Sequence, residues 1–359
     1  MLAVLSAVML SQTPDSLPIA SNPGEKHLAN IRQLTFGGQN AEAYWNAEGT
    51  KLTYQTRQPQ FPDEQIFEMN ADGSNKRLVS TGLGRTTCSY YTPDGKWIYF
   101  SSTHAINPGP QKPLDFSKGY VWMVNPEFSL YRIKTESLPI EPAGMSGTAA
   151  ELRPAPKFER VINKKSYVAE TTIAPNGKFM VWTSDYQGDL DIYRSDLKGR
   201  HTKRLTHLVG YDGGPFVSWD SSKVVYRRDT LQTDAEVKDY QDLLKEHLIR
   251  PNKLEIWIMD ADGRNMQQVT NLRCASFAPF LSPDNQHVIF SSNNGDPKGR
   301  EFDIYMINVD GSGLEKITDT PEFDGFPMFS RDGKKLVFCS NRNGKVPHET
   351  NVFVADWIP

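Results

Sequence analysis

The segment Tyr91-Thr-Pro-Asp-Gly-Lys-Trp-Ile-Tyr-Phe-Ser-Ser102 decides the fold of this chain, because the same phrase recurs along it. The phrase is an apolar residue, a tight turn with Asp or Asn and Gly, and a Lys-led apolar run ending in a small polar group. A second clear copy runs from Phe329 to Ser340. More divergent copies begin at Trp45, Ile173, Ser218 and Leu281. A phrase that recurs six times along the chain predicts a repeat architecture.

Each repeat contains the pattern of four short strands. The Asp/Asn-Gly pairs favour hairpin turns, and the Val, Ile, Phe, Tyr and Trp around them favour strands. A third strand follows in most repeats, as in Asp303–Gly311, and a short fourth strand closes the unit, as in Glu315–Thr318. Four antiparallel strands repeated radially predict an all-β fold, a β-propeller. Six copies predict six blades, and a seventh blade between Ser101 and Val161 is the alternative.

Two long gaps between repeats predict insertions. The first gap holds a Pro/Gly-rich stretch, His104–Gly119, and a second irregular stretch, Ser137–Lys157. The second gap holds residues 233–249, whose apolar positions have helical spacing, and Pro251 ends that pattern. We therefore expect one surface helix within an otherwise all-β domain.

The two ends of the chain predict how the ring closes. The chain ends on a third strand, Val352–Asp356, without a fourth strand after it. A fourth-strand phrase stands near the start instead, at Asn30–Thr35. Pairing between these two segments would remove the open sheet edge. This predicts one propeller domain over residues 30–359, preceded by an apolar, signal-like or tether segment and linker over residues 1–29.

Bulk properties narrow the class of protein. The net charge is −3 with both signs mixed, which does not favour nucleic-acid binding. Cys88, Cys274 and Cys339 fall on separate predicted blades, so they are not a disulfide framework. Residues 1–10 are apolar but too few to span a bilayer. They favour export over a cytosolic location and could also contact a membrane surface or a partner.

The blade phrases resemble the repeats of TolB-type propellers. The resemblance rests on apolar-Ser-Pro-Asp-Gly-Lys, then Asp-Ile-Tyr-apolar-Met-Asn-x-Asp-Gly, then Lys-x-Leu-Thr, and it covers roughly residues 30–359. It implies a periplasmic protein that binds partner proteins and is not an enzyme. TolB also carries a separate N-terminal α/β domain, and the sequence ahead of residue 30 has no room for it, which argues against a direct role in the Tol system.

The same propeller type also accompanies enzymatic activity. It forms the non-catalytic half of some serine peptidases, but Gly144-Met-Ser-Gly-Thr148 is not a nucleophile elbow because its second Gly comes one position early. Oligogalacturonate lyases share the repeat and use a metal held mainly by His. The chain has seven His, and none of them matches that pattern residue by residue.

Four carboxylates are expected near one mouth of the central channel. Counting back from the aligned turns places the starts of the innermost strands at Asn40, Thr86, Val168, Asp212, Ser276 and Asp324. Two residues further on stand Glu42, Cys88, Glu170, Gly214, Ala278 and Phe326. Clustered carboxylates can recruit a hard cation, so Glu42, Glu170, Asp212 and Asp324 are candidate calcium ligands. The alternative is that each is solvated or paired with an Arg. Asp260-Ala-Asp-Gly263 is better explained as a hairpin turn than as a calcium loop.

A second candidate set follows the second strand of each blade. These residues should share one face and could bind an anionic ligand, or simply be solvated: Arg57, His104, Asp185, Arg228, Asn293, Arg342 and His348.

Three functions are consistent with these patterns. The first is a non-catalytic binding or scaffold propeller that docks proteins on a loop face shaped by the insertions. The second is a lyase or hydrolase acting on an anionic saccharide or peptide at the channel mouth. The third is an accessory subunit of a larger, membrane-associated assembly.

Overall fold

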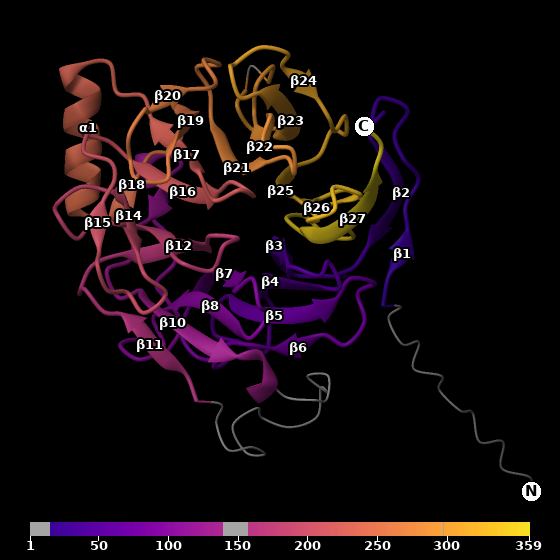
Figure 1. The fold of residues 1–359 in the computed structure, drawn as a ribbon, viewed down its shortest axis with the longest axis horizontal. Helices are drawn as coiled ribbons and strands as arrows, with labels where there is room; N and C mark the ends of the chain where they lie inside the picture. The colour runs from indigo at the N-terminus through magenta and orange to yellow at the C-terminus, as the bar shows by residue number, and fades with distance from the viewer. Residues whose placement is uncertain (1–14, 139–156, 297) are drawn as a thin grey trace, which may run out of the picture.

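Six antiparallel sheets, five of four strands and one of five, surround a central axis in the computed structural model, which describes residues 15–138, 157–296 and 298–359. The innermost strands meet around the axis, and the outer strands form the rim (Figure 1). This confirms the six-bladed β-propeller. The described residues between Ser101 and Val161 complete the second blade with β10 and β11, and they do not form a seventh blade.

The blades follow the chain in order. Blade 1 contains β3 (Gln39–Trp45), β4 (Lys51–Arg57), β5 (Gln65–Asn70) and β6 (Arg77–Leu78). Blade 2 contains β7 (Thr86–Tyr91), β8 (Trp97–Ser102), β10 (Ser129–Lys134) and β11 (Glu159–Ile162). Blade 3 contains β12 (Val168–Ile173), β13 (Met180–Ser184), β14 (Asp191–Ser195) and β15 (Lys203–Arg204).

The second half of the ring repeats the plan. Blade 4 contains β16 (Asp212–Val217), β17 (Lys223–Asp229), β19 (Leu254–Asp260) and β20 (Gln267–Gln268). Blade 5 contains β21 (Ser276–Leu281), β22 (His287–Ser292), β23 (Asp303–Asn308) and β24 (Glu315–Lys316). Blade 6 contains β25 (Asp324–Phe329), β26 (Lys335–Ser340) and β27 (Asn351–Trp357).

The N-terminal segment completes blade 6, as predicted. Strand β2 (Leu28–Gln33) pairs antiparallel with β27, and the short β1 (Leu17–Pro18) pairs with the outer edge of β2. Figure 1 shows both strands beside β27 at the edge of the ring. The ordered contacts start before residue 30, because Glu25 is also buried within the propeller. This closure pairs the edge strand of the last blade and seals the ring.

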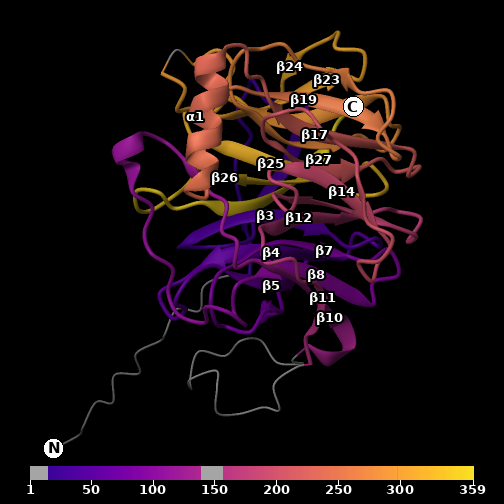
Figure 2. The same ribbon diagram turned by 90° about the vertical axis from the view of Figure 1, so that its left-hand side faces the viewer.

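The two insertions meet each other on one face of the ring. The predicted helix is α1 (Asp234–Lys245), and it is followed by β18 (Leu248–Ile249), which pairs with β9 (Trp122–Met123) from the first insertion. Figure 2 shows α1 and the loop with the 3-10 helix η1 (Phe116–Lys118) projecting from the same face. A second 3-10 turn, η2 (Thr135–Ser137), ends where the second predicted irregular stretch, Ser137–Lys157, begins. Most of that stretch lies outside the described residues.

The core lies between the blades. Apolar side chains of adjacent sheets interlock, with large buried residues such as Trp182, Phe290 and Phe353. The three cysteines, Cys88, Cys274 and Cys339, are free thiols. In the part of the chain that the structure describes, none of the helices has the length and apolar character needed to cross a membrane.

Candidate functional site

The innermost strands place equivalent residues in three rings around the axis. The first ring holds the predicted strand starts, and all six residues are buried: Asn40, Thr86, Val168, Asp212, Ser276 and Asp324. Five of them are the first residue of their strand, and Asn40 is the second residue of β3. The alignment of repeats therefore located the channel from sequence.

The second ring consists of residues in the left-handed backbone region. The torsion angle φ lies between 49° and 57° at all six positions: Glu42, Cys88, Glu170, Gly214, Ala278 and Phe326. The strand register shifts around each of these residues, which therefore form a β-bulge in every blade. Only one of the six is glycine, so five carry backbone strain that the surrounding sheet maintains. Together these residues line a small central chamber of about 40 Å³.

The third ring fills the channel with mostly aromatic side chains. It consists of Tyr44, Tyr90, Thr172, Phe216, Phe280 and Met328. The ring of Phe216 lies 5.5 Å from that of Tyr44, 6.2 Å from that of Tyr90 and 5.4 Å from that of Phe280. These aromatic contacts join blades on different sides of the axis and divide the channel in two. One part is the chamber, and the other is a cavity of about 50 Å³ among the hairpin turns.

An arginine neutralises one chamber carboxylate. Arg227 of β17 is 8% exposed and forms an ion pair with Glu170, while its Nε donates to the Tyr211 hydroxyl at 2.9 Å. The Tyr211 hydroxyl donates to Glu170 Oε1 at 2.7 Å, and the Gly214 amide donates to Oε2 at 2.8 Å. The left-handed Gly214 is required here, because a Cβ at this position would lie 2.6 Å from Arg227 Nη1. Glu170 is therefore fully engaged within the protein.

The second chamber carboxylate has no such cation in contact. Burial raises the pKa of the Glu42 carboxyl, against the opposing effects of a Cys88 hydrogen bond and the charge of Arg227. Burial and the nearby charge of Glu42 also raise the pKa of the Cys88 thiol. Burial in the chamber therefore disfavours the charged forms of both Glu42 and Cys88 beside the Glu170–Arg227 pair.

The insertions cover the chamber on the side where the inner strands start. The Trp122 ring of β9 lies 5.2 Å from the Arg227 guanidinium carbon and 6.1 Å from the ring of Phe277. Strand β18 holds this position, with Ile249 opposite Trp122 in the register. The repeat pattern contains no strand signal at these short segments, so the cover could not be predicted from it. The aromatic plug on one side and this cover on the other enclose the chamber.

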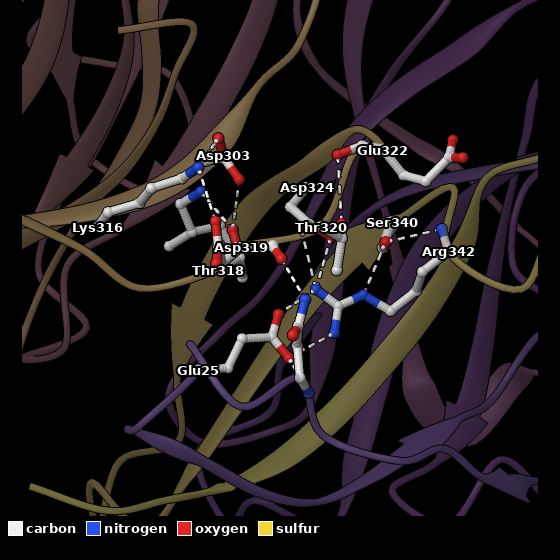
Figure 3. A network of polar contacts seen from close by, with 12 residues as sticks. Glu25, Asp303, Lys316, Thr318, Asp319, Thr320, Glu322, Asp324, Ser340 and Arg342 are labelled. Atoms are coloured by element: carbon white, nitrogen blue, oxygen red, sulfur yellow. Dashed lines mark hydrogen bonds and ion pairs between the residues drawn. The ribbon is translucent and has the colours of Figure 1, made fainter. Parts of the chain in front are cut away.

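A second ion-pair network joins blade 6 to the N-terminal segment (Figure 3). The Arg342 guanidinium donates to Glu25 Oε1 at 2.7 Å and to Asp324 Oδ2 at 2.9 Å. Thr320 donates its hydroxyl to Asp324 at 2.9 Å. Burial raises the pKa of Asp324, and Arg342 opposes that rise. Arg342 is 6% exposed, so its charge is balanced by these carboxylates inside the protein.

The corresponding carboxylate of blade 4 is less well paired. Asp212 is completely buried and lies 3.5 Å from Arg228 Nη1, but neither of its oxygens has a hydrogen-bond partner among the described residues. Burial raises the pKa of Asp212 well above its usual range, with Arg228 acting in the opposite direction.

The structure does not gather the four predicted calcium ligands into one cluster. Glu170, Asp212 and Asp324 each face an arginine, which is the alternative that the sequence left open, and Glu42 lies in a different ring from Asp212 and Asp324. Within residues 15–138, 157–296 and 298–359, no group of three or more His, Cys, Asp or Glu side chains is placed to hold a metal ion. Asp212 and Asp324 lie in the first ring and Glu42 and Glu170 in the second, and the two carboxylates of each ring belong to different blades.

The predicted ligand set on the loops is also dispersed. Arg57 and His348 are exposed, whereas Arg228 and Arg342 are buried in the ion pairs above. His104 is half-buried, with its ring 4.3 Å from that of Tyr131, and burial lowers its pKa to about 4. Asp185 accepts a hydrogen bond from the Tyr167 amide at 2.8 Å, and burial raises its pKa. Asn293 is buried; its Oδ1 accepts from the Ala275 amide, and its Nδ2 donates to the Gly299 carbonyl of its own loop at 3.0 Å.

One large cleft was not predicted from the sequence. It has a volume of about 580 Å³ and lies between α1 and the loops of blade 3. Of the predicted residues only Asp185 lines it, together with His207, Val209, Tyr240 and His247 among others. The repeat pattern gives no signal for this cleft, because its outer wall is the inserted helix.

Comparisons with known proteins agree with this architecture. A family model described as the TolB beta propeller domain matches residues 247–349. A curated but uncharacterized protein of Agrobacterium fabrum is 22% identical over 220 residues, which are 57% of this chain and 65% of that protein. The match thus spans just under two thirds of that relative.

Solved structures share the fold at low sequence identity. A proposed TolB of Agrobacterium tumefaciens matches with a TM-score of 0.53 and 17% identity, over 90% of this chain and 91% of the other. TolB of Acinetobacter baumannii has a TM-score of 0.50 and 16% identity, over 89% of this chain and 64% of the other. An oligogalacturonate lyase in complex with manganese has a TM-score of 0.54 and 11% identity, over 96% and 97%.

The fold and the central rings define a six-bladed β-propeller protein with a filled channel. Residues 247–349 match the TolB beta propeller domain model, and the likeness to the TolB structures extends the shared fold over most of the chain. Since the same fold also includes a lyase, fold likeness alone does not select an activity.

Proposed function

We propose that the protein is a non-catalytic binding or scaffold propeller of the cell envelope, which docks partner proteins on the face that carries the insertions. The observation that carries this proposal is that the charged residues at the channel mouth pair with one another inside the protein. Arg227, Arg228 and Arg342 face Glu170, Asp212 and Asp324, while Trp122 and the aromatic plug fill the axis. The surface left for recognition is the loop face with its two insertions.

Exposed apolar side chains on that face support protein recognition. Tyr120 of the first insertion is 64% exposed, and Leu208 and Val209 between blades 3 and 4 are 61% and 48% exposed. Aromatic and apolar side chains of this kind serve as anchors in protein interfaces. The likeness to TolB proteins and the apolar residues 1–10 support export to the periplasm as part of the same proposal.

Crosslinking in intact cells of the native host, followed by mass spectrometry, tests this function. We expect one or a few partner proteins joined to the insertion face, and the protein to be released with the periplasmic fraction. Tyr120→Ser should reduce the crosslinked yield severalfold. Leu314→Ser is the matched control, since Leu314 is 39% exposed and lies in a third-to-fourth-strand turn on the opposite face.

Two results would contradict the proposal. One is a protein that forms no crosslinks in its own compartment. The other is turnover of an anionic saccharide or peptide by the purified protein, abolished by Glu42→Gln in the chamber, which would support a catalytic function instead.

A further inference from the structure

The cleft beside α1 occupies the space between the loops of two successive blades. Its floor is the connection from blade 3 to blade 4, residues 206–211, and one wall is the loop after β13, including Asp185 and Asp189. The other wall is the last two turns of α1, where the Tyr240 hydroxyl donates to Asp189 at 2.5 Å. This bond fixes the helix against blade 3 and leaves the cleft open to solvent above it.

The equivalent position between blades 5 and 6 is filled by the chain itself. Residues Asn22–Glu25 lie against the connection from blade 5 to blade 6 and next to Arg342, which starts the following loop. The Asn22 side-chain amide donates to the backbone oxygen of Asp319. A Cβ on Gly24 would lie 2.6 Å from Asp319 Oδ2, so the segment is in close contact there. Glu25 then provides a carboxylate to Arg342 at 2.7 Å.

The strand register makes the two positions equivalent. Asp212 and Asp324 both begin an innermost strand, and Asp191 and Asp303 both begin a third strand. Aligning the connections on these residues places His207 at the position of Asp319, Leu208 at that of Thr320 and Val209 at that of Pro321. The cleft between blades 5 and 6 thus holds an extended segment, residues 22–25, with one acidic side chain, Glu25.

The groups that remain available in the open cleft favour an acidic occupant. The acids of the cleft are engaged from within: Asp189 accepts from the Tyr240 hydroxyl and the Leu190 amide, and Asp185 accepts from the Tyr167 amide. In contrast, the exposed imidazoles of His207 and His247 make no hydrogen bond within the described residues. Val209 also lines the cleft, and its neighbour Leu208 on the same connection is 61% exposed.

We propose that this cleft binds an extended segment of a partner protein that carries an acidic side chain, as the cleft between blades 5 and 6 binds residues 22–25. The acid reaches His207 and His247, and an apolar residue of the segment packs on Leu208 and Val209. The inference rests on the proposed binding function and assigns it to a defined site. The volume of about 580 Å³ accommodates several side chains of such a segment.

Peptide display on the immobilised full-length protein tests this assignment. Random twelve-residue peptides would be selected, and the most enriched peptide synthesised with a fluorescein label for anisotropy titration. We expect the enriched peptides to share Asp or Glu beside an apolar residue. The double variant His207→Asp with His247→Asp should weaken binding about tenfold through charge repulsion. Leu208→Ser should weaken it severalfold, and Val346→Ser is a matched control with the same 61% exposure on a loop of blade 6.

Each possible outcome either supports the assignment of this cleft as the binding site or overturns it. Enriched peptides without a shared acid, or an affinity unchanged by the histidine and leucine variants, would overturn the site while the proposed binding function stands. If no peptide is enriched, the site is also overturned, and crosslinking in cells still decides the broader function. A peptide whose acid-to-amide substitution removes the difference between wild type and the double histidine variant supports the assignment.

Discussion

The clefts between blades 5 and 6 and between blades 3 and 4 use the same loop framework in opposite ways. In the first, Arg342 hydrogen-bonds two carboxylates, one of them from the N-terminal segment, and the chain covers the cleft. In the second, Arg228 stands 3.5 Å from Asp212 without a hydrogen bond, and the cleft beside α1 stays open. A repeated framework can therefore close the ring at one interface and present a surface at another.

The two guanidiniums reach comparable positions from different points in the sequence. Arg228 stands directly opposite Asp212 in the strand register, whereas Ser340 stands opposite Asp324 and Arg342 follows two residues later. Arg228 lies 5.4 Å from the ring of Trp257, and Arg342 lies 5.0 Å from the ring of Phe338. The longer reach from the loop allows Arg342 to contact Glu25 as well, which ties the N-terminal segment to the ring.

Removal of Arg342 should give the largest effect on stability. Arg342→Met leaves Glu25 and Asp324 buried without their cation, so we expect the free energy of unfolding to fall by about 3–5 kcal/mol. Urea denaturation at neutral pH measures this loss. Arg228→Met is the matched variant in the other cleft, and we expect it to cost roughly 1–2 kcal/mol because Asp212 is already poorly paired. Equal losses for both variants would show that the two interfaces do not differ in the way described.

Asp229, which follows Arg228 at the end of β17, should contribute to the pH dependence of stability. Burial raises the pKa of Asp229 to about 7, and the register places Asn341 at the equivalent position of blade 6. Between its ordinary pKa of about 4 and about 7, the folded state binds more protons at Asp229 than the unfolded state does, so stability falls as pH rises through this window. Asp229→Asn should remove that part of the slope and add about 1–3 kcal/mol of stability at pH 8.

Unfolding curves at several pH values between 4 and 8 would measure the slope. The converse substitution, Asn341→Asp, should steepen the fall in stability with pH, since it places a carboxyl at the matching position of the other interface. A pH profile of Asp229→Asn that runs parallel to the wild-type profile would assign the slope to other groups.

The sequence predicted those features that depend on local repetition. The Asp/Asn-Gly turns and Lys-led strands recur with a fixed internal spacing, so the blades, the closure by Asn30–Thr35 and the starts of the inner strands followed from counting. The partners of charged groups were not predictable in the same way. Arg227 meets Glu170 from the neighbouring blade, and Glu25 meets Arg342 across 317 positions of sequence. These contacts depend on the angle between blades, which no local pattern encodes.

The insertions show the same limit. The helical spacing and Pro251 predicted a helix, but the strands β9 and β18 are only two residues long and have no periodic signal. Their pairing exists because both loops emerge on one face of the ring. The pairing of the two insertions produces both the cover over Arg227 and the cleft beside α1.

The smallest expected effect concerns the wall of the open cleft. Helix α1 starts with a capping box, in which the Thr233 hydroxyl accepts from the Glu236 amide at 3.2 Å and the Glu236 carboxylate accepts from the Thr233 amide at 3.1 Å. Thr233→Ala removes one of these bonds and should destabilise the helix by about 1 kcal/mol. Because α1 lies at the periphery, we expect faster hydrogen exchange in residues 234–245 and little change in global unfolding. Unchanged exchange there would show that the Tyr240–Asp189 bond, rather than the cap, holds this wall in place.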